Sequence, residues 1–318
     1  MRFAIFLLAF AAAPALSQQY PVRAVRLIVA SSPGSGVDIV ARIMAQKVST
    51  SLGQQVVVDN RAGAGANLGA EVAAKSPADG YTLLMGTPAH TINVSLYSGL
   101  GYDVVRDFAP VSLVSTGQYV VIVHPSVPAR TARELIALAK ARPGALGFGS
   151  AGPGNSTHLA GELFNSMAGI RMLHVPYKGS GPAMVDLMSG EIQVMFANIT
   201  AGLPYIRNQR VRGLAVTGPK RTPQAPDLPT VAETALPGYA VTSFFGVLAP
   251  TGTPASVIAK LNAEIVKAVH SPEVRSSLAH EGAEGIGSSP EDFAAYIRAE
   301  IPKWAVAVKT AGLQGQAK

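Results

Sequence analysis

Short apolar runs rich in β-branched residues alternate along this chain with segments whose apolar residues recur at helical spacing. The first such pair is a predicted buried strand at 25–30 and a predicted helix at 39–52, where Ile39, Ile43 and Val48 share one face. Repeated alternation of this kind is typical of mostly parallel sheets with helices on both faces. The pattern therefore predicts an α/β fold.

The alternation continues over most of the chain and then changes. Further strands are predicted at 56–58, 81–85, 119–123, 146–149, 172–175, 194–197 and 213–216, with helices at 67–75, from 131 onward and at 156–168. After a return strand at 245–248, three helices follow without strands between them, and each starts with a capping hydroxyl before a proline, at Thr253, Ser271 and Ser289. The chain is thus expected to end in a helical tail.

The domain organisation follows from two extended segments, 119–123 and 241–248, which we expect to cross between two lobes. A chain of 318 residues is long for one core and comfortable for two lobes. The predicted fold is a two-lobed clamshell of the periplasmic-binding-protein type, with mixed, mostly parallel sheets. The first lobe comprises 18–122 and, with the return strand and helical tail, 244–318; the second comprises 123–243.

The amino terminus has the three parts of a secretory signal. Arg2 supplies a positive charge, residues 3–13 are almost purely apolar, and Ala15 and Ser17 place small residues at the −3 and −1 positions of a cleavage site. A spanning helix needs roughly 20 apolar residues, so this run is too short to be one. The sequence predicts a signal peptide at 1–17, cleaved near Ser17, and a periplasmic protein. A short anchor or a buried strand is the alternative interpretation.

The composition and charge of the chain indicate which kinds of partner and cofactor to expect. The formal net charge is +7, but the basic residues are scattered and form no run, so no nucleic-acid partner is predicted. There is no cysteine, and no histidine pair has the spacing of a metal site, so neither cofactor nor metal is expected. Nothing in the sequence indicates an oligomer, and we expect a monomer.

A glycine-rich loop at 32–38 joins the first predicted strand to the first predicted helix. Glycines and a serine at a helix start expose backbone N–H groups where the helix dipole favours an anion. The same residues also suit a tight turn that binds nothing. The candidate ligand-binding residues of this loop are Pro33, Gly34, Ser35, Gly36 and Asp38.

A second loop, at 149–158, repeats this design in the other predicted lobe. Ligands of open α/β sheets bind beyond the carboxyl ends of strands, so an anion between the two loops would be contacted from both sides. Two further strand ends, at Thr87 and Asn198, complete the predicted wall. The candidates outside the first loop are Thr87, Ser150, Gly152, Asn155, Ser156, Thr157 and Asn198.

Enzyme signatures are weak. No segment fits the phosphate loop or the nucleophile elbow, and Leu68 occupies the third glycine position of a near-match to the dinucleotide fingerprint. Ser156 and His158 are close enough to form a catalytic pair, so a secreted hydrolase is the alternative function. No third residue that would orient the histidine is evident, and binding without chemistry is the favoured interpretation.

Ordered motifs along the chain resemble the Bug family, the receptors of tripartite tricarboxylate transporters. They include DNRAGAG at 59–65, ADGYTLL at 78–84, GSAG at 149–152, HVPYKG at 174–179 and PTVAE at 229–233. The resemblance implies a clamshell that closes over a carboxylate-bearing solute and performs no reaction. It maps the family's binding loops onto 32–38 and 150–157.

Two departures from the family pattern concern the ligand. Ser35 separates Gly34 from Gly36 where the family commonly has paired glycines, and Asn198 stands where the family often has an acidic residue. The second departure weakens the case for a ligand that carries an ammonium group. Dicarboxylates, tricarboxylates and aromatic acids such as nicotinate all remain compatible, and the downstream partner is either a membrane transporter or a sensor kinase.

The signal peptide gives a direct prediction. N-terminal sequencing of the protein isolated from its natural host should begin at Gln18 or within a few residues of it, because the small residues Ala15 and Ser17 define the cleavage site. A mature chain that begins at Met1 would contradict this prediction.

Overall fold

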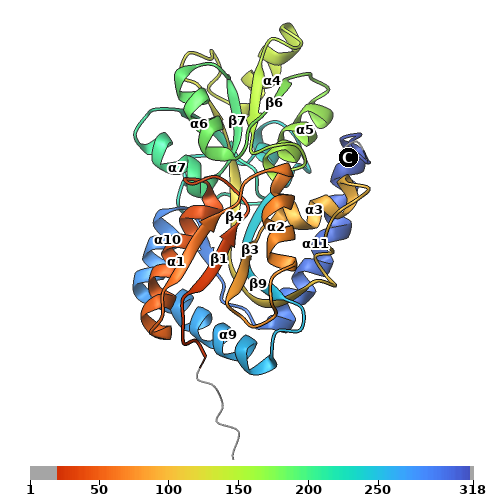
Figure 1. Ribbon diagram of the computed structural model, residues 1–318. Coiled ribbons are helices and arrows are strands. Elements are labelled where there is room, and N and C mark those ends of the chain that lie inside the picture. Colours follow the sequence, from red (N-terminus) through yellow and green to blue (C-terminus); the bar gives the residue numbers. More distant parts are fainter. Residues whose placement is uncertain (1–19, 316–318) are drawn as a thin grey trace, which may run out of the picture.

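The computed structural model describes residues 20–315, so the predicted signal peptide lies outside the described residues. Two lobes stack along the long axis of the molecule, each a sheet with helices on both faces (Figure 1). This is the predicted two-lobed α/β clamshell, and the prediction is confirmed. In the described part of the chain, no helix combines the length and apolar character needed to cross a membrane.

Ten strands are connected by hydrogen bonds in the described residues, eight of them along one path, while β8 and β10 pair with β4 beside that path. They are β1 (Val25–Val29), β2 (Val56–Asn60), β3 (Thr82–Gly86), β4 (Phe108–Val123), β5 (Gly147–Ser150), β6 (Leu173–Pro176), β7 (Val194–Asn198), β8 (Arg212–Val216), β9 (Thr242–Pro250) and β10 (Glu284–Gly285).

The helices fill the connections and the carboxyl-terminal quarter. They are α1 (Gly36–Leu52), a 3-10 turn (Ala64–Ala66), α2 (Asn67–Ala74), α3 (Pro88–Leu96), α4 (Ala132–Ala141), α5 (Ser156–Ala168), α6 (Ser180–Ser189), α7 (Ile199–Arg207), α8 (Val231–Thr234), α9 (Ala255–His270), α10 (Pro272–His280) and α11 (Pro290–Thr310).

The sheet order explains how the site is assembled. In the lobe that contains β1, the strands β2, β1 and β3 are parallel, and β9 and β4 follow as antiparallel strands. In the other lobe, β7, β5 and β6 are parallel, and β4 pairs with β7 and β8 in the antiparallel sense. The carboxyl ends of the parallel strands in both lobes therefore lie toward the junction between the lobes.

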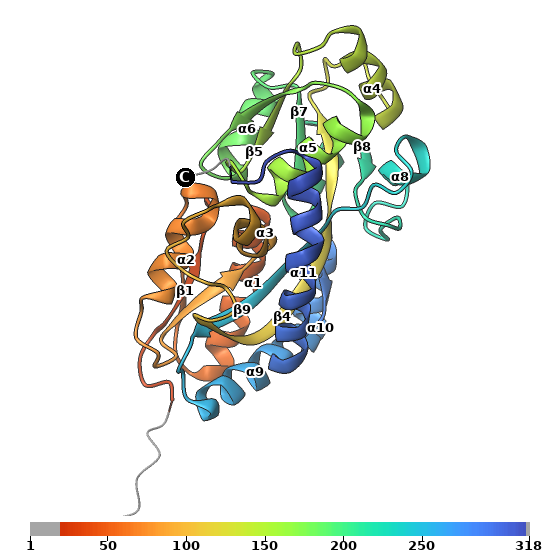
Figure 2. The same cartoon turned by 90° about the vertical axis from the view of Figure 1, so that its right-hand side faces the viewer.

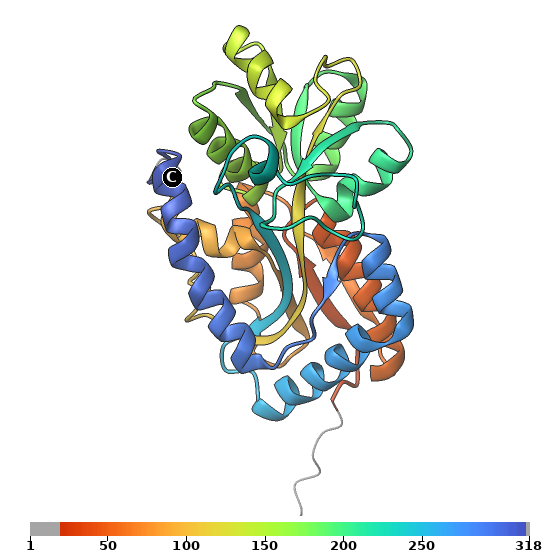
Figure 3. The ribbon, with the colours of Figure 1, turned by 180° about the vertical axis from the view of Figure 1, so that it is seen from behind.

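Two long strands meet at that junction: β4 continues through it and β9 begins there (Figures 2 and 3). β4 pairs with β9 from Phe108 to Gln118, and from Tyr119 onward it pairs with β7 and β8. β9 begins at Thr242, opposite Gln118. Both segments predicted to cross between the lobes are thus strands, and β4 is longer than expected because its first half pairs with β9.

Alternating residues of the central strands supply two cores in each lobe. In β1, Leu27 and Val29 point toward α1, α9 and α10, whereas Ile28 packs with residues of α2, α3 and α11. A strand directs successive side chains to opposite faces, so a strand covered on both faces must be apolar at every position. This is the physical reason why the first predicted strand reads as a continuous apolar run.

The last helix of the tail spans both lobes (Figure 2). Phe293 and Ile297, in its first half, pack in a core with β1, β3 and β9. Trp304 and Val308, near its end, pack in the core of the other lobe with β4, β5 and β7. The tail therefore connects the lobes in addition to the two crossing strands.

We predict that α11 is essential for the stability of the ligand-free protein. Phe293 is fully buried against Gly246 and Phe244, so Phe293→Ala should lower the free energy of unfolding by about 3–5 kcal/mol. Val306 lies on the same helix and is 66% exposed, so Val306→Ala should change the free energy of unfolding by less than about 0.5 kcal/mol. Denaturant unfolding checks both values, and equal effects would contradict the packing described.

Candidate functional site

A small cavity of about 40 Å³ lies between the lobes, at the carboxyl ends of the parallel strands. The starts of six helices, α1, α2, α3, α5, α6 and α7, contribute lining residues. Among the described residues that line it, none is Asp, Glu, Lys, Arg or His. Backbone dipoles and hydroxyl groups, and not charged lining side chains, therefore set the electrostatic potential in the cavity.

The first loop is held in shape by Asp38. Its carboxylate accepts hydrogen bonds from the Gly34 N–H at 2.9 Å, from Asn60 Nδ2 at 2.9 Å and from Arg42 Nε at 3.0 Å. Burial alone would raise the pKa of Asp38, but these hydrogen bonds outweigh it and the pKa lies below its usual range. Asp38 is thus an ionised residue that faces the loop and Arg42, and it does not line the cavity.

The start of α1 leaves two donors free. The Asp38 N–H reaches Ser35 Oγ at 3.4 Å and the Ile39 N–H reaches the Ser35 carbonyl at 3.0 Å. Within residues 20–315, the N–H groups of Gly36 and Val37 have no hydrogen-bond partner, as expected for the first turn of a helix. Both residues line the cavity, so both N–H groups are available to an anion.

The second loop follows the same principle. The Thr157 N–H donates to Asn155 Oδ1 at 3.2 Å and the His158 N–H to the Asn155 carbonyl at 2.9 Å. The Ser156 N–H has no partner in the described part of the chain, and Ser156 lines the cavity. Helix α5 therefore presents one free donor from the opposite lobe.

Two histidines, the buried His158 and the half-buried His174, support this loop from behind. The rings of His158 and His174 stack with centroids 3.8 Å apart. His158 Nδ1 accepts from the Gly154 N–H at 3.1 Å, and His174 Nε2 lies 2.6 Å from Ser150 Oγ. Burial lowers the pKa of His158 to about 3, with the neighbouring His174 contributing, and burial lowers that of His174 to about 4. Both imidazoles are therefore neutral structural groups.

The geometry of this loop argues against Ser156 and His158 as a catalytic pair. Ser156 Oγ donates to Asn155 Oδ1 at 3.2 Å and faces the cavity, whereas His158 is committed to Gly154 and to the stack with His174. A general base must be within hydrogen-bonding reach of the nucleophile. The hydrolase interpretation of Ser156 and His158 has no support in the structure.

Asn198 joins the two lobes at the floor of the cavity. It caps α7 by accepting from the Thr200 N–H at 3.1 Å, and its Nδ2 donates to Ser243 Oγ of β9 at 2.8 Å. A β-carbon added to Gly36 would lie 2.7 Å from Asn198 Oδ1. Glycine at position 36 is therefore what allows α1 to approach the opposite lobe so closely.

Other contacts across the cleft show that the lobes are closed on each other. The Gly181 N–H of α6 donates to Ser32 Oγ at 3.3 Å, and the Tyr97 hydroxyl donates to the Pro153 carbonyl at 3.3 Å. Gly65 is packed equally closely, since a β-carbon there would lie 2.4 Å from the Pro153 oxygen. These pairs flank the cavity and limit access from solvent.

The predicted site residues divide into two groups. Those that line the cavity are Ser35, Gly36, Thr87, Asn155, Ser156, Thr157 and Asn198. Those that do not line it are Pro33, Gly34, Asp38, Ser150 and Gly152. The second group shapes the loops instead: the N–H groups of Gly34 and Gly152 are bonded to Asp38 and to Ser150 Oγ, so these glycines have no free N–H for a ligand.

The sequence interpretation missed nine lining residues, namely Ala30, Ser31, Val37, Ala66, Pro88, Tyr119, Ala151, Ser180 and Phe245. Val37 and Ala151 lie inside the predicted loops 32–38 and 149–158 but were not among the chosen candidates, whereas Ser31 directly precedes the first loop and Pro88 directly follows Thr87. Tyr119 and Phe245 lie on the crossing strands, where an apolar pattern marks burial and gives no sign that a cavity is next to it. Ser180 begins α6, whose start has no side-chain cap.

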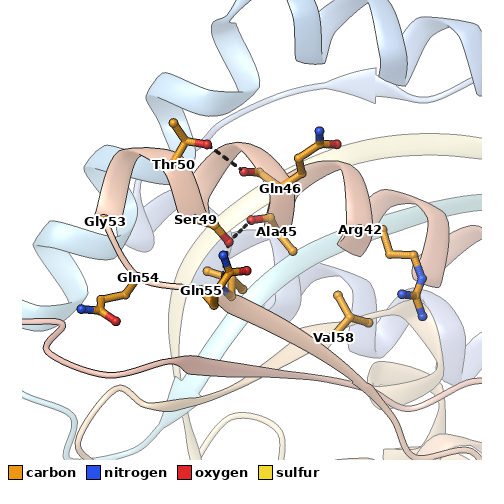
Figure 4. Close-up of a pocket in the computed structure, with 10 residues that line it drawn as sticks. Arg42, Ala45, Gln46, Ser49, Thr50, Gly53, Gln54, Gln55 and Val58 are labelled. Atoms are coloured by element: carbon orange, nitrogen blue, oxygen red, sulfur yellow. Dashed lines mark hydrogen bonds between the residues drawn. The ribbon is translucent and has the colours of Figure 1, made fainter.

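A second hollow lies on the outer edge of the first lobe, between the end of α1 and β2 (Figure 4). Ser49 and Thr50 face it, and their hydroxyls bond back to the carbonyls of Ala45 and Gln46. It sits near Gly53, at the carboxyl end of α1, where the helix dipole is negative and disfavours an anion. One lobe alone forms it, so lobe closure would not enclose a ligand there.

Comparisons with known proteins agree with this architecture. The family described as "Tripartite tricarboxylate transporter family receptor" matches residues 40–313. BugT of Bordetella pertussis is 38% identical over 303 residues, 95% of this chain and 93% of the relative. A UPF0065 protein of a Pseudomonas species is 42% identical over 286 residues, 90% of this chain and 85% of the relative.

Solved structures give the same result. Rpa4515 of R. palustris, determined with adipate, superposes with a TM-score of 0.90 at 39% identity and covers 92% of this chain and 98% of its own. MatC of Rhodopseudomonas palustris, with bound malate, has a TM-score of 0.87 at 31% identity, and the match covers 91% of this chain and 100% of MatC. The periplasmic binding protein BugD has a TM-score of 0.90 at 33% identity, and the match covers 93% of this chain and 99% of BugD. The chain therefore belongs to the tripartite tricarboxylate transporter receptor family, whose members are solute-binding receptors and not enzymes.

Proposed function

We propose that this protein captures a small carboxylic acid in the cavity between its lobes and presents it to a membrane transporter for uptake. The observation that carries the proposal is the set of free N–H groups at Gly36, Val37 and Ser156, which reach one cavity from two lobes. Structures of family neighbours with adipate and malate support a carboxylate as the ligand class. Presentation to a sensor kinase is the alternative role.

The chemistry of the lining favours an acid without an ammonium group. No carboxylate side chain lines the cavity, and both amide atoms of Asn198 are engaged with Thr200 and Ser243. An ammonium group would be buried without a counter-charge, which is costly. A carboxylate meets helix dipoles and free donors instead, and hydrogen bonds to a charged group contribute about 1.5–3 kcal/mol each.

Capture requires the lobes to open and close. We take the lobes as 18–122 with 244–318, and 123–243, connected by β4, β9 and α11. In the closed arrangement the lobes meet at Ser32 with Gly181 and at Tyr97 with Pro153. These hydrogen bonds and the close packing of Gly36 against Asn198 hold the lobes together, and an acid that bridges α1 and α5 adds further bonds across the cleft. The predicted site residues Pro33, Gly34, Asp38, Ser150 and Gly152 act in this scheme by shaping the two loops.

The proposal predicts that Gly36→Ala weakens binding at least tenfold, about 1.4 kcal/mol, because the new methyl group pushes Asn198 away and holds the lobes apart. Titration calorimetry with adipate and malate measures the affinities. Gly53→Ala, at the other end of α1, is the matched control. It meets no atom within 4 Å but has φ of 68°, so it should lower stability by about 1 kcal/mol and leave affinity unchanged.

A wild-type protein that binds neither of these acids nor a broader panel of mono-, di- and tricarboxylates would overturn the proposed function. Equal affinities of wild-type protein and Gly36→Ala would leave capture standing but show that the acid is held somewhere other than between α1 and α5.

A further inference from the structure

Tyr119 occupies the point where β4 changes partners between the lobes. Its cross-strand neighbour is Asn198 of β7. Its backbone is fixed on the other side by Thr217, whose Oγ accepts from the Tyr119 N–H at 2.9 Å and whose N–H donates to the Tyr119 carbonyl at 2.9 Å. The position of the phenol ring is therefore set by the sheet and not by a mobile loop.

The side chain of Tyr119 packs in a hydrophobic core and also lines the cavity. It is 2% exposed, packs in the core cluster that contains Phe148 and Phe164, and lines the cavity. Its hydroxyl interacts with Ser156, the first residue of α5. Burial raises the pKa of Tyr119, so the phenol is neutral and keeps its proton.

The available protons decide what this hydroxyl can do. Ser156 Oγ donates to Asn155 Oδ1 at 3.2 Å, and its lone pairs can accept a proton from Tyr119. An ionised carboxylate is also an acceptor only. The one proton of Tyr119 therefore has two candidate acceptors in this region, Ser156 Oγ and an acid in the cavity, and the charged acceptor forms the stronger hydrogen bond.

We propose that Tyr119 is a ligand-binding residue whose hydroxyl donates a hydrogen bond to the captured acid, next to the free N–H of Ser156. This inference rests on the proposed function and extends it, because it connects the acid to the crossing strand as well as to helix starts. An acid held by Tyr119 is bonded to the segment about which the lobes move, so binding and closure are mechanically linked.

The test compares Tyr119→Phe with Tyr239→Phe. Tyr239 lies in the same core cluster, is equally buried, and donates its hydroxyl to the Ala160 carbonyl of α5 at 2.8 Å, but it does not line the cavity. Calorimetry with adipate and malate should show at least tenfold weaker binding for Tyr119→Phe and a change below twofold for Tyr239→Phe. Thermal unfolding without ligand should show the larger loss of stability for Tyr239→Phe.

Combining Tyr119→Phe with Ser156→Ala separates a direct contact from an indirect one. If Tyr119 contacts the acid, its substitution weakens binding at least tenfold whether Ser156 is present or not. An effect that disappears in the Ser156→Ala background would overturn the inference, since Tyr119 would then act only by positioning Ser156. Equal affinities of Tyr119→Phe and wild type would overturn it too, with the proposed function intact. Wild-type protein that binds no acid would overturn both.

Discussion

The structure depends on one electrostatic arrangement, the meeting of unsatisfied helix N-termini from two lobes around a cavity without charged side chains. The first N–H groups of any helix lack partners, and capping residues normally satisfy some of them. Here Ser35 and Asn155 satisfy the later N–H groups of α1 and α5 and leave the earliest ones free. Because the positive ends of helix dipoles repel each other, an anion between them favours their approach, and we propose that the acid stabilises the closed arrangement in this way.

The fold could be predicted from the sequence because its signals are local. Apolar runs marked the buried strands, and a capping serine followed by proline marked α10 and α11. The same prediction was wrong for α9, where Pro254 takes the cap position and Thr253 Oγ1 donates to the Pro250 carbonyl instead. Helix α3 was missed although Thr87 and Pro88 show the same cap-and-proline start. The full length of β4 was missed because pairing with β9 is a long-range property, and Pro110 and the serines of its first half weaken a strand pattern.

The sequence predicted which loops form the site, but it could not predict which atoms of those loops face the cavity. Glycine at a helix start signals either a free N–H or a turn, and the sequence alone cannot distinguish them. The structure shows that Gly36 allows the close approach to Asn198, whereas Gly34 and Gly152 adopt left-handed turns whose N–H groups are bonded to Asp38 and Ser150. Tyr119 required the register of β4 against β7, which no local pattern encodes.

The central claim is that backbone N–H groups hold the acid, and amide chemical shifts test it most directly. In ¹H–¹⁵N spectra recorded with and without saturating adipate or malate, the amide protons of Gly36, Val37 and Ser156 should move downfield as they gain an acceptor. The amides of Asp38 and Thr157, already bonded to Ser35 Oγ and Asn155 Oδ1, should move far less. Large shifts confined to arginine or lysine side chains, with these three amides unchanged, would contradict the account.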